Sequence, residues 1–135
     1  MQQHLDAKDL ADYRLRLIER AREVQVNLQT LAEEADPTEH VTATSNHPAE
    51  GASDAERQFM VVASAAQESD LLQQIERALR KIDSGVPLAF GLCEYTRKPI
   101  DRQRLDLLPW TPFSVEALNE IESKNLDPDD LLIPA

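Results

Sequence analysis

The sequence has little of several residue types, and each shortage excludes a class of protein. It contains 1 Cys in 135 residues, which excludes an internal disulfide and gives no sign of an oxidising compartment. It has only 3 Gly and few aromatic residues, a composition that favours helix over sheet. No apolar run approaches the length of a membrane span, and the first residues do not resemble a leader. We therefore expect a cytoplasmic protein without a membrane partner.

Positive charge is also scarce. There are 14 Lys and Arg against 25 Asp and Glu, so the net charge is -11. Direct DNA binding requires clustered basic residues, and this balance argues against it. The chain shows no Ser-His-Asp set, no glycine loop for phosphates and no paired-carboxylate pocket. We therefore expect no enzymatic activity and no cofactor, and interpret the chain as one that binds another protein.

The first part of the chain carries a helical stripe of apolar residues. These residues are spaced by three or four positions, as on one face of a helix, and Asp6 or Asp9 could cap the start. The pattern predicts a helix over about residues 10–35, which Pro37 ends. Its members are Leu10, Tyr13, Leu17, Ala21, Val24, Leu28, Leu31 and Ala35.

A second stripe follows a turn-rich segment at about residues 36–52. Ser53 and Glu56 have the spacing of a capping box, and heptad-spaced apolar residues, interrupted at Glu68, continue to Ile82. Gly85 is suited to end the helix in the left-handed conformation. We predict a second helix over about residues 53–84. Because neither stripe can be buried alone, the two helices should pair as an antiparallel hairpin.

The chain changes character after residue 85. Prolines and aromatic residues predict a short irregular or β-hairpin unit, and Ser114 is a good N-cap for a brief helix. Four positions, Cys93, Thr96, Ser114 and Ala117, keep the C-x2-C-x17-C-x2-C spacing of a zinc ribbon. Since only Cys93 offers a thiolate, we predict no bound metal.

Packing of large side chains should replace the metal in this unit. The candidates are Phe90, Leu92, Tyr95, Trp110 and Phe113. Cys93 then acts as a small buried hydrophobe, and redox sensing is the alternative. The predicted fold is mainly α: a long antiparallel α-helical hairpin (coiled coil) over residues 1–85, a degenerate zinc-ribbon-like unit with a short C-terminal helix over 86–122, and an acidic tail over 123–135.

The second half of the chain resembles the DksA/TraR family of bacterial RNA polymerase-binding regulators. The resemblance rests on residues 72–85, 90–94, 98–100, 104–105, 108–112 and 115–117. It implies a hairpin that enters the secondary channel of RNA polymerase and regulates transcription initiation, in a family associated with the stringent response. It identifies RNA polymerase as the expected partner.

The resemblance also implies which residues contact the polymerase. An ungapped alignment places His47, Glu50 and Ala52 at the family's Asp-x-x-Asp-x-Ala tip motif, and Asp54 follows them. We expect these four residues to bind the partner. A second set of expected contacts lies at the hairpin root and consists of Arg97, Lys98, Arg102 and Arg104.

The family's contacts to guanosine tetraphosphate (ppGpp) are not kept in the alignment. Its basic residues correspond here to Gln67, Gln74, Leu108 and Leu118. Phosphates are held by Arg and Lys through charge-assisted hydrogen bonds, so weak or no ppGpp dependence is expected.

A different class of function stays open at this point. The chain could be a coiled-coil adaptor or oligomerisation protein unrelated to polymerase, with the ribbon-like unit as a docking element. We expect a monomer if the first interpretation holds, and a stable oligomer that ignores polymerase if the second does.

Overall fold

The computed structural model describes residues 4–34 and 51–134, with the side chains of residues 51–53 excepted. Contacts divide the chain into two compact units. The first combines Met1–Arg20 with Gln74–Ala135, and the second is Ala21–Gln73. This division differs from the boundary predicted after residue 85. The reason is that both helices contribute residues to the core of the first unit, so the helical and ribbon-like parts are not separate there.

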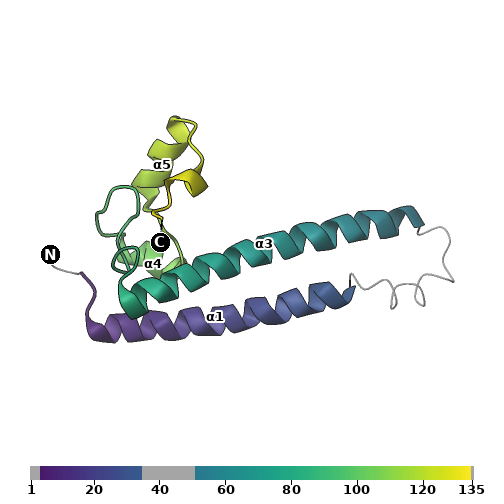
Figure 1. The fold of residues 1–135 in the computed structure, drawn as a ribbon, viewed down its shortest axis with the longest axis horizontal. Helices are drawn as coiled ribbons and strands as arrows, with labels where there is room; N and C mark the ends of the chain where they lie inside the picture. The colour runs from purple at the N-terminus through teal and green to yellow at the C-terminus, as the bar shows by residue number, and fades with distance from the viewer. Residues whose placement is uncertain (1–3, 35–50, 135) are drawn as a thin grey trace. The chain divides into compact units, whose positions relative to one another are not determined.

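The two long helices form the predicted antiparallel hairpin, and the fold is mainly helical (Figure 1). Helix α1 spans Ala7–Glu34, and α3 spans Gly51–Ser84. α1 begins earlier than residue 10 because Asp6 and Asp9 cap it reciprocally. The Asp9 amide donates to Asp6 Oδ1 at 2.8 Å, and the Asp6 amide donates to Asp9 Oδ2 at 3.1 Å. The predicted stop at Pro37 lies outside the described residues.

The start of α3 differs from the prediction, and its end agrees. The helix begins at Gly51, so Ser53 lies inside it and is not the N-cap that its spacing to Glu56 suggested. The end at Ser84 follows from Gly85, which has a φ of 70° and donates its amide to the Lys81 carbonyl at 2.9 Å.

The second unit buries a narrow apolar seam between its two helical segments. Val24 on α1 and Val61 on α3 are its buried hydrophobic residues among those described. Glu68 interrupts this seam as the sequence indicated, and its Oε2 is buried without a hydrogen-bond partner among the described residues. Three large apolar residues of α3 are instead exposed: Phe59, Met60 and Val62.

The first unit holds most of the buried apolar residues. α1 contributes Tyr13 and Leu17, and α3 contributes Ile75 and Ala78. The rings of Tyr13 and Phe90 pack with their centroids 5.5 Å apart. The remaining buried hydrophobic residues of this unit are Leu5, Cys93, Ile100, Leu105, Phe113, Ala117 and Ile121.

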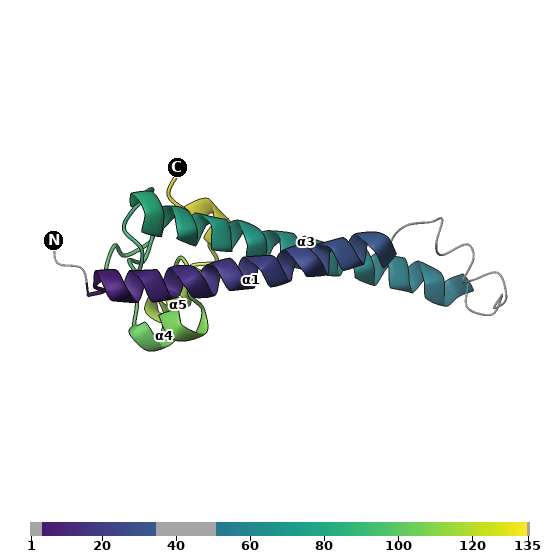
Figure 2. The same ribbon diagram turned by 90° about the horizontal axis from the view of Figure 1, so that it is seen from below.

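Three short helical elements follow α3 in this unit. Two of them, α4 and α5, are labelled in both views (Figures 1 and 2). α4 spans Arg102–Leu107, α5 spans Val115–Ser123, and the 3-10 helix η2 spans Pro128–Leu131. α5 was predicted, with Ser114 as its N-cap. α4 was not predicted, although Asp101 caps it by accepting from the Gln103 amide and Leu105 is its buried anchor.

The ribbon-like segment contains no strand among the described residues, only an antiparallel bridge between Leu92 and Pro99. Gly91 allows a close approach here: its φ is 90°, and a Cβ at this position would lie 2.8 Å from Leu5 Cδ1. His4 is half-buried beside it, and its Nε2 is 3.0 Å from the Ile100 carbonyl oxygen. Over the described part of the chain, no helix is long and apolar enough to span a bilayer.

Candidate functional site

The predicted tip residues are only partly within the described structure. His47 and Glu50 lie outside the described residues, and of Ala52 only the backbone, in the first turn of α3, is described. Asp54 also lies in that turn, where a negative charge is favourable because the N-terminal end of the helix dipole is positive. It is 3.9 Å from the Arg57 guanidinium, a loose contact at a partly exposed site.

The predicted basic residues of the hairpin root divide into two pairs. Arg97 and Lys98 are exposed, and Arg97 adopts a positive φ of 66°. Arg102 and Arg104 are engaged within the protein. Arg102 donates to Asp9 at 2.9 Å, and Arg104 donates to the Phe113 carbonyl at 2.9 Å. Arg97 and Lys98 are therefore better placed than the other pair to meet a partner.

The four zinc-spaced positions form a hydrogen-bonded knuckle around one thiol. Cys93 is fully buried, and its Sγ accepts from the amides of Thr96 and Ser114, both at 3.4 Å. The Ser114 hydroxyl lies 3.7 Å from the same sulfur. Ser114 Oγ in turn accepts from the Ala117 amide at 3.1 Å, which caps α5. The two pairs of zinc-spaced positions, 93 with 96 and 114 with 117, are thus joined through Cys93 and Ser114.

The donor set does not fit zinc. A structural zinc site uses four thiolate, imidazole or carboxylate ligands, whereas these positions offer one thiol, two hydroxyls and a methyl group. Within the part of the chain that is described, no group of three or more His, Cys, Asp and Glu side chains could hold a metal either. Burial acts to raise the pKa of the Cys93 thiol, but the hydrogen bonds from Thr96 and Ser114 outweigh it and lower the pKa.

Next to the thiol, Glu94 forms a buried ionic cluster that the sequence analysis did not identify. Its carboxylate accepts from Arg77 Nε at 2.7 Å and from Arg77 Nη2 at 2.5 Å, and it lies 2.7 Å from Lys81 Nζ. The side chains of Glu94 and Lys81 are 0% and 5% exposed. The sequence did contain one signal for such a cluster: Arg77 and Lys81 are four residues apart, so both lie on one face of α3 and can meet the same anion.

The same cluster holds the end of the chain. The Ile133 amide donates to Glu94 Oε1 at 2.9 Å, and the Ile133 carbonyl accepts from Arg77 Nη2 at 2.6 Å. The sequence predicted an acidic tail over residues 123–135. The structure attaches part of this segment to the first unit through Arg77 and Glu94.

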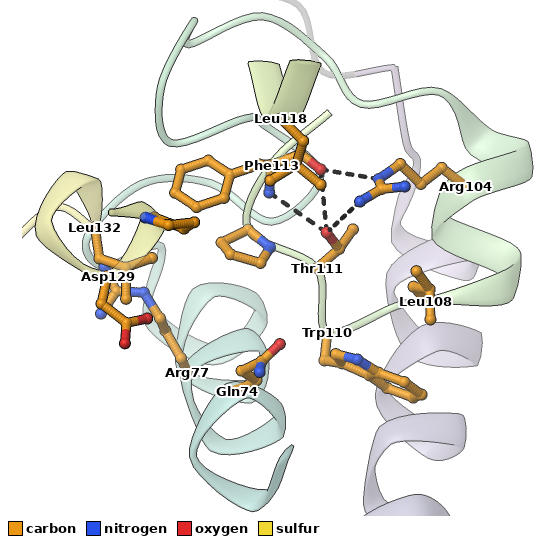
Figure 3. A pocket seen from close by; sticks show the side chains of 12 residues that line it. Gln74, Arg77, Arg104, Leu108, Trp110, Thr111, Phe113, Leu118, Asp129 and Leu132 are labelled. Atoms are coloured by element: carbon orange, nitrogen blue, oxygen red, sulfur yellow. Dashed lines mark hydrogen bonds between the residues drawn. The ribbon is translucent and has the colours of Figure 1, made fainter. Parts of the chain in front are cut away.

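A pocket of about 290 Å³ lies in the first unit, beside this cluster (Figure 3). Its lining comes from α3, α4, the 108–113 loop, α5, η2 and Leu132 after η2. Trp110, expected in the core, is only partly buried and lines this pocket, whereas Phe90 and Phe113 are buried as expected. The lining residues are Gln74, Arg77, Arg104, Leu108, Trp110, Thr111, Pro112, Phe113, Leu118, Pro128, Asp129 and Leu132.

Three of the four positions aligned with the family's ppGpp-binding residues line this one pocket. They are Gln74, Leu108 and Leu118. Where the resemblance implies Lys or Arg, this chain therefore presents an amide and two apolar side chains. The fourth position, Gln67, lies on α3 in the second unit.

Comparison with known proteins supports the fold. The chain shares its fold with the solved structure of transcription factor DksA2 from Pseudomonas aeruginosa, with a TM-score of 0.75 and 24% identity, over 90% of this chain and 89% of that one. The predicted DksA/TraR-like fold is thus confirmed. A 53-residue segment is 36% identical to general stress protein 16O of Bacillus subtilis. That match spans 39% of this chain and 31% of the relative. Models of known protein families give no match.

Proposed function

We propose that this protein regulates transcription by binding RNA polymerase through the hairpin of α1 and α3, without zinc and with weak or no dependence on ppGpp. The observation that carries the proposal is the shared fold with a transcription factor over nine-tenths of the chain. The hairpin and the knuckle after it are both part of that shared fold, so the elements that would reach and hold a partner are kept together.

In this proposal the end of the hairpin enters the secondary channel of the polymerase. His47, Glu50, Ala52 and Asp54 make the contacts there, and Glu50 is the principal acidic group. A carboxylate presented to a charged channel adds specificity and speeds association. Arg97 and Lys98 are exposed at the other end of the proposed interface, and Arg102 and Arg104 serve chiefly to hold the first unit together.

The first experiment measures binding of the purified chain to RNA polymerase, with competition by a known secondary-channel factor. Glu50→Ala should abolish the effect on transcription while leaving polymerase binding intact. Glu116→Ala, which removes an exposed carboxylate of α5, is the matched control and should change neither. Absence of polymerase binding by the unaltered chain refutes the proposal.

A second experiment separates the tip from the rest of the hairpin. Residues 47–54 are replaced by a Gly-Ser segment of the same length, and transcription is measured with and without ppGpp. We expect loss of regulation and no ppGpp effect on the unaltered protein. Full regulation by the Gly-Ser variant would refute the tip mechanism, and strong ppGpp potentiation would refute the inference drawn from Gln74, Leu108 and Leu118.

One observation favours a second candidate function, a coiled-coil adaptor. Phe59, Met60 and Val62 of α3 are 75%, 66% and 63% exposed, which is unusual for a cluster of large apolar residues. Native mass measurement at several concentrations distinguishes the candidates. A stable oligomer that does not bind polymerase supports the adaptor, and a monomer that binds polymerase supports the regulator.

A further inference from the structure

An open pocket lies within the second unit, at the point where Glu68 interrupts the apolar seam. Its volume is about 260 Å³. α1 supplies Asn27, Thr30 and Leu31 to its lining, and α3 supplies Ser64 and Glu68. Asn27, Thr30 and Ser64 are exposed, so a group from outside the protein can reach the pocket directly.

Glu68 has an acceptor that the fold leaves unused. It stands in the heptad run of α3 at a position where an apolar residue is expected. Its Oε2 is buried and has no hydrogen-bond partner among the described residues. The two basic residues of this unit, Arg22 and Arg57, do not line the pocket. A buried carboxylate oxygen without a partner is destabilising, so its presence in the seam requires an explanation other than packing.

The surroundings of the pocket favour a positively charged group. Residues 21–73 include 10 Asp and Glu against 2 Arg and no Lys, so the field of this unit attracts cations and repels anions. The carboxamide of Asn27 and the hydroxyls of Thr30 and Ser64 offer oxygens that can accept hydrogen bonds. Leu31 adds apolar surface, on which the methylene stem of a long basic side chain can pack. The group that fits is therefore a cation with several donors on an aliphatic stem.

We propose that this pocket binds the guanidinium group of an arginine presented by a protein partner, with Glu68 as its counter-charge. A guanidinium has five N–H donors in a planar fork and is weakly hydrated, whereas a lysine ammonium is compact and strongly hydrated. The fork can donate to the Glu68 carboxylate and to the neighbouring oxygens of Thr30 or Ser64 at the same time. The inference holds whichever protein presents the arginine, so it does not rest on the proposed regulatory function.

The test uses three blocked tripeptides of the form Gly-X-Gly, in which X is arginine, lysine or citrulline. Lysine carries the same charge as arginine, and citrulline has nearly the same shape without the charge. The full ¹⁵N-labelled chain is titrated with each peptide at constant ionic strength. NMR shifts of the Asn27 side-chain amide and of the Ser64 and Glu68 backbone amides report binding at the pocket. We expect the arginine peptide to bind at least about threefold more tightly than the lysine peptide, and the citrulline peptide to bind most weakly.

Three variants test the role of Glu68. Glu68→Gln keeps the shape and should weaken the arginine peptide at least about fivefold, the effect of one charge-assisted hydrogen bond at a partly exposed site. Asp70→Asn is the matched control, because it removes the same charge from an exposed position of α3 that does not line the pocket. It should change the affinity less than about twofold. Glu68→Leu should abolish binding and raise the midpoint of denaturant unfolding, because it continues the heptad run and removes the unpaired acceptor.

Three results would overturn the proposal. Equal binding of the arginine and lysine peptides would show general attraction to an acidic unit and no site for a fork of donors. Equal affinities of Glu68→Gln and Asp70→Asn would place the peptide elsewhere. A loss of stability in Glu68→Leu would show that Glu68 serves the fold and not a partner. Because no polymerase is present, these results are independent of whether the chain regulates transcription.

Discussion

Removal of the Glu94 carboxylate tests what holds the first unit together. Glu94→Ala deletes the acceptor of two bonds from Arg77, one from Lys81 and one from the Ile133 amide. It leaves two cations in place, one of them on a side chain that is only 5% exposed. Neither cation has another carboxylate within ion-pair distance among the described residues. The variant therefore tests an uncompensated buried charge and a released C-terminal segment together.

The expected loss follows from the burial of the cluster. Breaking a buried ion pair by removing one partner costs about 3–5 kcal/mol, because the remaining charge stays desolvated. For a chain of this size, about 4 °C of melting temperature corresponds to each kcal/mol, so the midpoint should fall by about 12–20 °C. An exposed pair behaves differently. Glu120→Ala removes the partner of Lys124, which is 54% exposed, and should leave the midpoint unchanged within error.

The assay follows Trp110 fluorescence during denaturant and thermal unfolding, since this tryptophan lies in the first unit. Limited proteolysis near residue 133 reports release of the C-terminal segment. Glu94→Gln keeps the shape and removes the charge, and should lose stability to an intermediate degree. The reasoning is refuted if Glu94→Ala loses no more stability than Glu120→Ala, or if it leaves the C-terminal segment protected.

The stability that Glu94 contributes should also depend on pH, and the direction of its pKa shift fixes whether that stability is lost in acid or in base. Burial acts to raise the pKa of Glu94, but the bonds from Arg77, Lys81 and the Ile133 amide outweigh it and lower the pKa. The unfolded value is about 4.3, so the folded value lies below it. The stability contributed by the ionised Glu94 carboxylate is fully present above the unfolded pKa, and it is lost as pH falls through the folded pKa. Acid unfolding of Glu94→Gln should show a shallower loss over that window, and an unchanged profile would contradict the assignment.

Three further predictions concern other residues of the first unit. Gly91→Ala should cost about 2–4 kcal/mol of unfolding free energy, because Gly91 has a positive φ and the added Cβ would lie 2.8 Å from Leu5 Cδ1. Gly85→Ala should cost about 1 kcal/mol, because Gly85 also has a positive φ but has open space around it. Denaturant unfolding measures both. Zinc or a chelator should leave the melting temperature unchanged, since Cys93 is the lone thiol, and a large shift would show a metal site. Arg14→Ala should cost less than about 1 kcal/mol in a denaturant titration, because the side chains of Arg14 and its ion-pair partner Asp83 are both about half exposed.

The helical hairpin could be predicted because its signal is local and repeated. The residues of the first stripe follow the helical period, and Tyr13, Leu17 and Val24 are buried as that period requires. The end of the second helix is fixed by one residue, Gly85, whose left-handed conformation is a property of its type. The start of α3 was misplaced because Ser53 and Glu56 have capping-box spacing inside a helix that begins two residues earlier.

The Glu94 cluster could not be predicted in the same way. Its members lie 17 and 39 residues apart in the chain, and no periodic pattern joins them. A charged residue in a sequence is ordinarily interpreted as solvated, and Glu94 is buried only because the fold brings Arg77 and Lys81 to it. Trp110 shows the converse. Its size suggested the core, but it is only partly buried and lines a pocket, whereas Phe90 and Phe113 are buried.

Cys93 and Glu94 together explain how a ribbon-like unit can stand without a metal. A zinc ion joins two ligand pairs at one point, and here the sulfur of Cys93 joins the same two segments by accepting from Thr96 and Ser114. Those bonds to sulfur are weaker than metal–thiolate bonds, so they alone would not replace the ion. Glu94 adds links that a zinc at this position would not make, to α3 and to the Ile133 backbone. The stabilisation is therefore spread over three segments of the chain, and the folding of this unit should follow pH and the integrity of the C-terminal segment instead of metal supply.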